Sequence, residues 1–498
     1  MMEALVLSAV LVSGALVLRT CGLRGWGLLP LGFLTGTFLI VVVGAILVVF
    51  ALPTRPSVML GVLAVSALAA GSISWFRRDR ILGRDWVVIG VGLLALTGAV
   101  FAFRDANLVS YHIDSFRYLA SSGLLAADAY ALATPDLLTK RLLAAPVMHS
   151  LAWLHEEQYV RSFSPLLMLA LLGSVAWIVR QGYGQARGTF LQGRGAAVAI
   201  GIGLLLLVTN NRMVWNSFYI NDHLFFAAAF LPACSLGWLL ARGRSDLAPG
   251  MVAVAALGLA GLVVTRPEGF IAGAFALLPL FVQRSVPLWV RRVVLAAYGA
   301  ATSSWYGYVA LRSHSELGEI HFHTVGPLIV GLLALATIPA LRWIRHALEH
   351  RNLLIALEVT LWLGLAAFAI RDSRILIRSL EATYLNVVAG EGSWGSSLVL
   401  LALLVVFVVL LNRDRTVVSL RFPLTAFVPT FFLIAYLQDS SYRVGHGDSL
   451  NRMLMQIVPL AVLYLLASLR SEEWRLDAPA GYEEAQAGVV REAKPVSR

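Results

Sequence analysis

Long apolar runs recur along almost the whole of this 498-residue chain, most of them close to the roughly 20 residues that a helix needs to cross a bilayer. In hydrocarbon only helices and closed barrels satisfy all backbone hydrogen-bonding groups, and runs of this length favour helices. Charged residues make up 13% of the chain, compared with about a quarter in soluble domains. We therefore predict an all-α polytopic membrane protein.

The hydropathy pattern predicts about 13 to 15 transmembrane helices. We expect them near residues 4–18, 28–52, 57–76, 86–103, 163–179, 195–209, 222–241, 250–264, 269–282, 293–311, 325–341, 353–370, 396–411, 422–437 and 454–469. They divide the chain into additional N-terminal helices over 1–85, a central module over 86–345, C-terminal helices over 346–470 and a flexible tail over 471–498. The tail is rich in Glu, Pro, Ala and Gly, which is typical of a solvated segment.

Basic residues indicate which side of the membrane each connector faces. Most of the 39 Lys and Arg residues lie in alternate connectors and in the tail, and such connectors usually face the cytoplasm. We therefore expect a multi-pass protein of the inner (plasma) membrane, with a cytoplasmic C-terminus and with the long connector 104–162 on the periplasmic or extracellular side. The net charge of +11 is spread over helix ends, so we expect no nucleic-acid partner.

The connector 104–162 is the longest polar interruption, and it carries Asp105, His112 and Asp114. Stretches near 115–125 and 137–154 have the spacing of amphipathic helices, which we expect to lie on the membrane surface as a lid. Asp105 directly follows a predicted span, so its carboxylate is expected near the interface. It either caps that span beside Arg104 or acts on a substrate.

Three further outer connectors combine charged side chains with other polar residues. Asn221, Asp222 and His223 precede an apolar run; Asp222 can simply cap that helix, whereas the whole group suits a polar ligand such as a sugar, or a divalent cation. In Thr265–Gly269, Arg266 and Glu268 either neutralise one another or leave Arg266 to contact phosphate.

The last of these connectors, 443–452, contains His446 and Arg452 among glycines. The glycines permit close approach of a ligand to the backbone, although a plain turn has the same composition. Acids and arginines on one outer face suit transfer of a group from a phosphate-linked lipid. A carboxylate activates the incoming hydroxyl, and cations hold the departing phosphate, which needs no general acid.

This arrangement resembles the GT-C superfamily of integral-membrane glycosyltransferases, which use polyprenyl-phosphate-linked sugars. Asp105 with Tyr111-His112 is similar to the Asp…Tyr-His pattern of bacterial members, on a long first outer loop with surface helices. Asn221-Asp222-His223 falls on the acidic position at the head of a helix two spans later, and Thr265–Gly269 is similar to a Thr-Lys/Arg turn followed by Gly. The resemblance runs from about Trp86 to Val282 and leaves the first three spans as an addition.

The resemblance implies an inverting glycosyltransferase of cell-envelope glycan biosynthesis, with 86–345 as its catalytic module. The donor is a polyprenyl-phosphate-linked sugar, and the acceptor is a hydroxyl of a glycan, lipid or protein. Asp105 is the expected general base, with Asp114 as the alternative. The expected substrate-binding residues are His112, Asp114, Asn221, Asp222, His223, Arg266, Glu268, His446 and Arg452. No residue is assigned as a metal ligand, and a Mg²⁺ or Mn²⁺ cofactor is left open.

A transporter or lipid flippase is the alternative, since it also needs many spans and a few interfacial charges. Transporters place ionisable groups near the bilayer midplane in broken helices. Glu358 is the carboxylate that falls inside a predicted span, near an end from which its side chain can reach water. A scaffold that keeps the fold without catalysis is the third interpretation.

Overall fold

The computed structural model describes residues 2–76, 84–104, 113–140, 142–183, 194–316, 352–412, 414–445 and 448–469, and every regular element within them is a helix. The long helices are α1 (Met2–Thr20), α2 (Pro30–Val49), α3 (Pro56–Phe76), α4 (Arg84–Phe103), α8 (Phe163–Tyr183), α9 (Arg194–Val208), α11 (His223–Ala241), α12 (Ala248–Val263), α13 (Pro267–Val282), α14 (Leu288–Glu316), α17 (Asn352–Arg371), α18 (Ser373–Val387), α19 (Gly395–Leu411), α20 (Val418–Leu437) and α21 (Ser449–Ser468). Shorter ones are α5 (Ile113–Ala126), α6 (Pro135–Lys140), α7 (Ala144–Ser150) and α10 (Asn211–Asn216). Short 3-10 helices are η1 (Gly25–Leu28), η2 (Tyr130–Leu132), η3 (Leu151–His155), η4 (Ser245–Leu247) and η6 (Arg415–Val417).

Each expected span that falls in the described residues is a helix, and the expected span 325–341 lies outside them. Ten helices in the described part of the chain are long and apolar enough to cross a membrane, and three further apolar helices are shorter. By the length and composition of its helices, the chain is thus a multi-pass membrane protein. The predicted total of 13 to 15 includes these shorter helices and α14.

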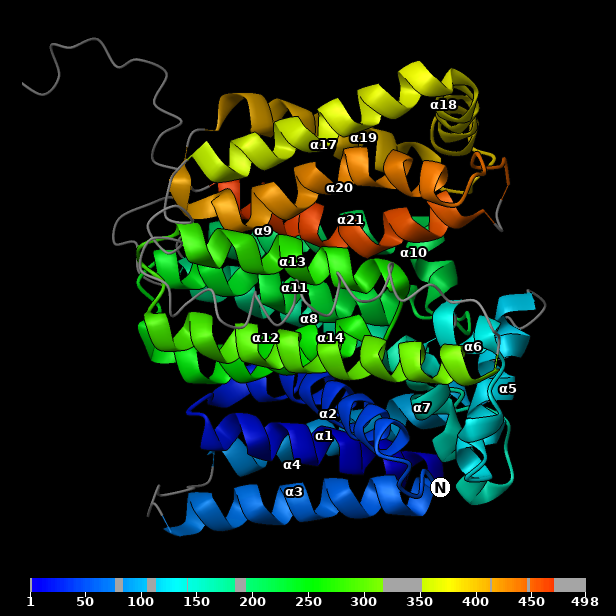
Figure 1. The fold of residues 1–498 in the computed structure, drawn as a ribbon. Helices are drawn as coiled ribbons and strands as arrows, with labels where there is room; N and C mark the ends of the chain where they lie inside the picture. Colours follow the sequence, from blue (N-terminus) through cyan, green and yellow to red (C-terminus); the bar gives the residue numbers. More distant parts are fainter. Residues whose placement is uncertain are drawn as a thin grey trace, which may run out of the picture.

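The helices form layers that follow the sequence, with α1–α4 at the bottom of Figure 1, α8 and α11–α14 in the middle and α17–α21 at the top. Nearly every residue of α11 and α21 is buried, so these two helices form the centre, whereas most of α17 is exposed. The N-terminal helices are not separate from this core, because α2 packs against both α8 and α12.

Because successive helices alternate in direction, the first residues of helices that are far apart in the sequence lie at the same end of the bundle. The starts of α11, α13 and α21 lie at the end of the bundle where α5, α6 and α7 extend beyond it, on the right of Figure 1. We call this the loop end. Hydrogen bonds join the connector to it: among them, Leu143 N–H donates to the Val264 carbonyl at 2.8 Å, and the Ser115 hydroxyl donates to the Ile220 carbonyl at 3.0 Å. The ends of α11 and α13 and the start of α20 lie at the opposite end.

The connector 104–162 differs from the expected pair of surface helices. The first is confirmed as α5, which is amphipathic, since Tyr118 is buried and Phe116 is exposed. The expectation of one surface helix over 137–154 is wrong. That stretch is divided into α6, α7 and η3, and all seven residues of α7 are buried. The backbone N–H groups of Leu143 and Ala145 donate to atoms of the bundle, so α7 is inserted into it and does not lie flat as a lid.

His149 in α7 makes the stability of the fold depend on pH. Its side chain is buried, and its Nδ1 accepts a hydrogen bond from Val160 N–H at 3.3 Å. Burial lowers the pKa of His149 from 6.5 to about 3, so the folded protein keeps a neutral imidazole where the unfolded chain takes up a proton. The stability from this difference is complete above pH 6.5 and is lost as the pH falls toward 3, amounting to about 2 kcal/mol lost at pH 5.

We expect the melting temperature of the detergent-solubilised protein to fall between pH 7 and pH 5. The matched variant is His149→Gln, whose amide oxygen can still accept the bond from Val160 but cannot take up a proton. Its melting temperature should depend less on pH over the same range. Parallel curves for the two proteins would show that His149 does not carry the effect.

Candidate functional site

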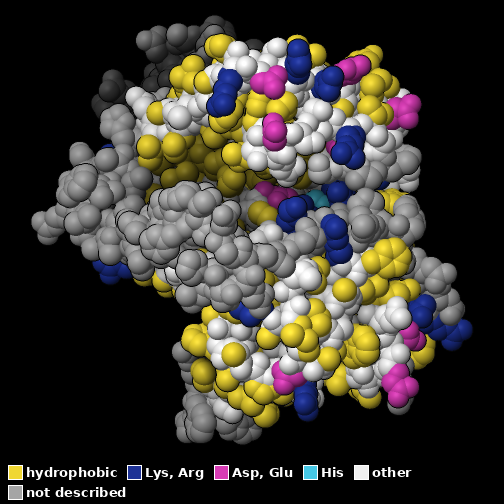
Figure 2. Space-filling model, turned by 45° about the vertical axis from the view of Figure 1, so that its right-hand side comes forward, with side chains coloured by type: hydrophobic (Ala, Val, Ile, Leu, Met, Phe, Trp, Pro, Cys, Tyr) yellow, Lys and Arg dark blue, Asp and Glu magenta, His cyan; other side chains and the backbone are white. Residues whose placement is uncertain are grey.

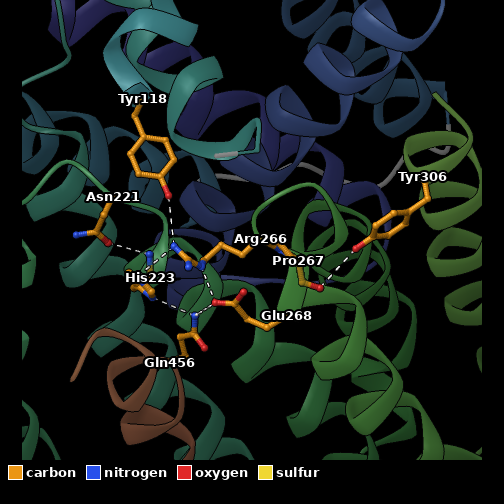
Figure 3. A network of polar contacts seen from close by, with 8 residues as sticks. All are labelled: Tyr118, Asn221, His223, Arg266, Pro267, Glu268, Tyr306 and Gln456. Atoms are coloured by element: carbon orange, nitrogen blue, oxygen red, sulfur yellow. Dashed lines mark hydrogen bonds and ion pairs between the residues drawn. The ribbon is translucent and has the colours of Figure 1, made fainter. Parts of the chain in front are cut away.

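The loop end contains a buried polar network built from four separate segments. Figure 3 shows Tyr118 of α5, His223 at the start of α11, Arg266 and Glu268 around the start of α13, and Gln456 of α21 directed toward one another. The described side chains in this group are all buried or nearly so. Burial of so many polar groups is costly unless they are bonded, so the contacts within the network decide what it can do.

Arg266 and Glu268 form the charged centre of the network. Arg266 Nε lies 2.5 Å from Glu268 Oε1, with the two side chains 12% and 9% exposed. The turn that brings them together is tight, because a Cβ on Gly269 would lie 2.0 Å from the Leu262 carbonyl oxygen. The expectation that the two charges neutralise one another is therefore confirmed in geometry.

The ion pair does not use the whole guanidinium of Arg266. Its Nη1 lies 3.4 Å from the Tyr118 hydroxyl and 3.2 Å from His223 Nε2, and its Nη2 has no hydrogen bond to a described residue. Burial alone would lower the pKa of Arg266, but Glu268, with smaller contributions from Tyr118 and Asp222, outweighs burial and raises the pKa above its ordinary value. The guanidinium thus stays charged and keeps donor capacity for an anion.

His223 lies between two donors, and this sets its protonation state. Besides Arg266 at Nε2, the Gln456 amide nitrogen lies 3.0 Å from its Nδ1. An imidazolium would present N–H groups to both donors and place a second positive charge beside Arg266, so this geometry favours a neutral ring. A neutral imidazole accepts only one hydrogen bond, and Gln456 Nε2 has Glu268 Oε1 as a second acceptor at 3.3 Å. Gln456 Oε1 has no partner among the described residues.

Asp222 does not act as the simple helix cap that its position allows. It is the N-cap residue of α11, yet its side chain makes no capping hydrogen bond. Instead Oδ1 accepts a hydrogen bond from Ala145 N–H of α7 at 2.7 Å. The carboxylate is fully buried, so it ties α7 to the head of α11.

Tyr130 lies near Asp222 and is a site residue that the sequence did not indicate. Burial raises the pKa of Tyr130, and the nearby Tyr308 and Asp222 raise it further. Its hydroxyl has no hydrogen-bond partner in the described part of the chain. A buried neutral hydroxyl near a carboxylate is a donor that a polar ligand could use.

The asparagines of the connector before α11 bond mainly to one another and to the backbone. Asn210 caps α10 by accepting from Met213 N–H, and Asn221 Nδ2 donates to Asn216 Oδ1 at 2.6 Å while its Oδ1 accepts from His223 N–H at 2.8 Å. These bonds shape the connector. Their crowding in the sequence is thereby explained without a ligand.

Arg452 and Asp448 stand at the start of α21. Asp448 caps the helix by accepting from Leu450 N–H at 2.9 Å, and burial raises the pKa of its carboxyl. Arg452 is buried one helical turn before Gln456, on the same face of α21. The structure therefore brings this expected residue to the same end of the bundle as Arg266.

Several expected site residues cannot be placed in this geometry. Asp105, His112 and His446 lie outside the described residues, and Asp114 is the second residue of α5, with a side chain that is not described. Of the expected residues that are described, Asp222, His223, Arg266, Glu268 and Arg452 gather at the loop end, and Asn221 supports His223. Tyr118, Tyr130 and Gln456 lie at the same end, although the sequence analysis did not name them. Gln456 could have been predicted, because it is a polar residue in an apolar helix and follows Arg452 by one helical turn.

The shape and charge of this part of the molecule bear on what it can bind. Figure 2 shows a hollow in the face turned to the viewer, lined by hydrophobic side chains, with acidic, basic and histidine side chains gathered at one side of it. Among the described residues no group of three or more His, Cys, Asp or Glu side chains has the arrangement of a metal site. The carboxylates and guanidiniums at this bundle end can orient a polar, anionic ligand.

Comparisons with protein-family models, with curated proteins and with solved structures find no match to this chain.

Proposed function

We propose that this protein is a membrane glycosyltransferase that moves a sugar from a polyprenyl-phosphate-linked donor to an acceptor hydroxyl of a glycan, lipid or protein. The observation that carries the proposal is the buried network at the loop end, in which Arg266, His223 and Gln456 come from three helix starts. Such an arrangement offers a fixed cation beside neutral hydrogen-bonding groups, which is what a sugar phosphate requires. An apolar hollow beside charged groups suits an isoprenoid chain with a phosphate head.

The reaction assigns a role to each part of the site. The acceptor oxygen attacks the anomeric carbon of the donor sugar, and its proton goes to the carboxylate of Asp105 or, alternatively, Asp114. The bond between the anomeric carbon and the phosphate oxygen breaks with its electron pair on the phosphate. Because the acceptor attacks from the face opposite the departing phosphate, the configuration at the anomeric carbon inverts. Arg266 and Arg452 hold the departing polyprenyl phosphate, while Asp222 and His112 orient the sugar or the acceptor. The reaction takes place on the outer face of the inner membrane.

The test is a transfer assay with purified protein in liposomes. Labelled polyprenyl-phosphate sugars are supplied with a mixture of acceptor glycans and lipids, and the products are separated from the donor. The proposal expects label in an acceptor and free polyprenyl phosphate in equal amounts. Label that crosses the bilayer without transfer would support the transporter alternative and reject the enzyme.

The transporter alternative has less support from the described residues. Glu358 of α17 is paired within the bundle: its carboxylate lies 3.2 Å from Arg421 Nη2 of α20 and accepts from the Thr425 hydroxyl at 2.6 Å. Its charge is therefore paired between two helices. The unusual polar groups instead gather at helix starts, at one end of the bundle.

Asp222 allows its structural and functional roles to be separated. Asp222→Asn keeps an oxygen for Ala145 N–H, so the free energy of unfolding should change by no more than about 1 kcal/mol, whereas Asp222→Ala should lower it by about 1–3 kcal/mol. Both variants should lose transfer by about 10- to 100-fold if the carboxylate also bonds the sugar. Wild-type transfer by a folded Asp222→Asn variant would restrict Asp222 to holding α7.

A further inference from the structure

A second cavity lies at the end of the bundle opposite the candidate site. It has a volume of about 1070 Å³ and lies between the ends of α11, α13 and α19 and the starts of α17 and α20. Its rim includes Arg284, Arg415 and Arg421. Because α11 and α13 run from one end of the bundle to the other, this cavity is separate from the network around Arg266.

The charges around the cavity leave an excess of positive charge. Its carboxylate, Asp414, lies 3.6 Å from Arg242, and Arg421 is paired with Glu358. Arg284 and Arg415 are exposed and form no ion pair with another described residue. Two basic side chains at the mouth thus have no acidic partner in the described part of the chain.

Several buried polar groups in the wall of the cavity have no hydrogen-bond partner among the described residues. Arg421 Nε, Asn412 Nδ2 and the Thr416 hydroxyl are buried and make no hydrogen bond to the described residues. All three can donate, and an unmet buried donor is costly. Gln283, of which only 8% is exposed, adds an unpartnered Oε1 to the same wall, and this acceptor suits a hydroxyl group of a ligand and not its phosphate. Donors beside excess positive charge are the chemistry that binds phosphate oxygens.

The other walls of the cavity are apolar and continue onto surface that lies in lipid. Ile355 of α17 is 49% exposed and Leu410 of α19 is 75% exposed, and both line it. α17 and α19 are among the most exposed apolar helices of the described chain, as expected for surfaces in contact with acyl chains. A water-soluble anion would gain nothing from these walls.

We propose that this cavity binds the phosphate headgroup of an anionic phospholipid in the leaflet opposite the candidate site, with its acyl chains against α17 and α19. Basic pockets between transmembrane helices are suited to such headgroups, and a basic side chain near an anionic lipid surface contributes about 1 kcal/mol, or about fivefold in affinity. The site is independent of sugar transfer.

The experiment measures lipid binding to the full-length protein in neutral detergent by native mass spectrometry and by thermal stabilisation. We expect phosphatidylglycerol to bind and stabilise, and phosphatidylcholine to do so much less. Arg284→Gln combined with Arg415→Gln should weaken phosphatidylglycerol binding about thirtyfold, and each single variant about fivefold. Arg292→Gln is the matched control, because Arg292 is exposed at the same end but does not line the cavity.

The outcomes separate the two sources of phosphate. Equal stabilisation by glycerol phosphate or inorganic phosphate would overturn a lipid ligand and indicate a site for a soluble anion. Wild-type phosphatidylglycerol binding by the double variant, or losses as large in Arg292→Gln, would overturn the site itself. Should the double variant not be recovered, unchanged binding by both single variants has the same meaning. None of these measurements depends on sugar transfer, so their results do not decide whether the proposed glycosyltransferase function is correct.

Discussion

Replacing Arg266 by Met, with Glu268 left in place, should lower the free energy of unfolding by about 3–5 kcal/mol. The Glu268 carboxylate is 9% exposed, and the variant leaves it buried without a cation, with the Gln456 amide and its own backbone N–H as described hydrogen-bond donors. The rate of sugar transfer should also fall by about 100- to 1000-fold, since removing one group that stabilises the charge on the leaving phosphate slows a reaction by about this factor. Denaturant unfolding and the transfer assay measure the two effects.

The double variant Arg266→Met with Glu268→Leu distinguishes a purely structural ion pair from a functional one. Replacing both partners of a buried pair with apolar residues is often neutral in stability. We therefore expect stability close to wild type and no recovery of transfer. A stable double variant with wild-type transfer would show that the pair only neutralises itself.

A matched control for the single variant is available at the opposite end of the bundle. Arg244 and Asp246 have the same spacing in sequence and lie 2.9 Å apart, but Asp246 is 60% exposed. The ion pair contributes about 0–1 kcal/mol, and the two hydrogen bonds from Arg244 to Gln181 about 1 kcal/mol each, so Arg244→Met should still change stability less than Arg266→Met. Similar losses of unfolding free energy in the two variants would contradict the claim that burial makes the Arg266–Glu268 pair important for stability.

Asp105→Asn should reduce transfer by about 100- to 10,000-fold while leaving stability nearly unchanged. The amide retains the shape of the side chain but cannot take the proton of the acceptor hydroxyl. The rate is measured with saturating donor and acceptor, so that a loss reflects the chemical step.

Asp114→Asn is the companion variant, because both aspartates lie in the same connector. The larger loss identifies the base. If both variants transfer sugar at wild-type rate, the general base lies elsewhere and the assignment based on the connector is wrong.

The positions of the transmembrane helices followed from the sequence because they depend on local composition. A run such as Leu224–Leu240 can only be a helix in lipid, and it is one. The clustering of helix starts followed from the alternation of the helices. The closeness of Arg266 and Glu268 followed from their spacing in a short turn.

Contacts between distant segments did not follow from the sequence. Asp222 has the position of a helix cap, and only the fold shows that Ala145 N–H, 77 residues away, binds it instead. Gln456 is 188 residues from Glu268, so their contact depends on how α21 and α13 both pack against α11. The burial of α7 was missed because its apolar residues continue the pattern of α6, which favoured one amphipathic helix.

The central claim is that the loop end binds a polyprenyl phosphate, and photoaffinity labelling tests it most directly. A polyprenyl-phosphate analogue with a photoreactive group near the phosphate is irradiated with the wild-type protein in liposomes, and labelled peptides are identified. The account predicts labels around Arg266–Glu268 and the start of α21, which excess polyprenyl phosphate removes. Labels confined to the lipid-facing surfaces of α17 and α19, unaffected by competitor, would contradict it.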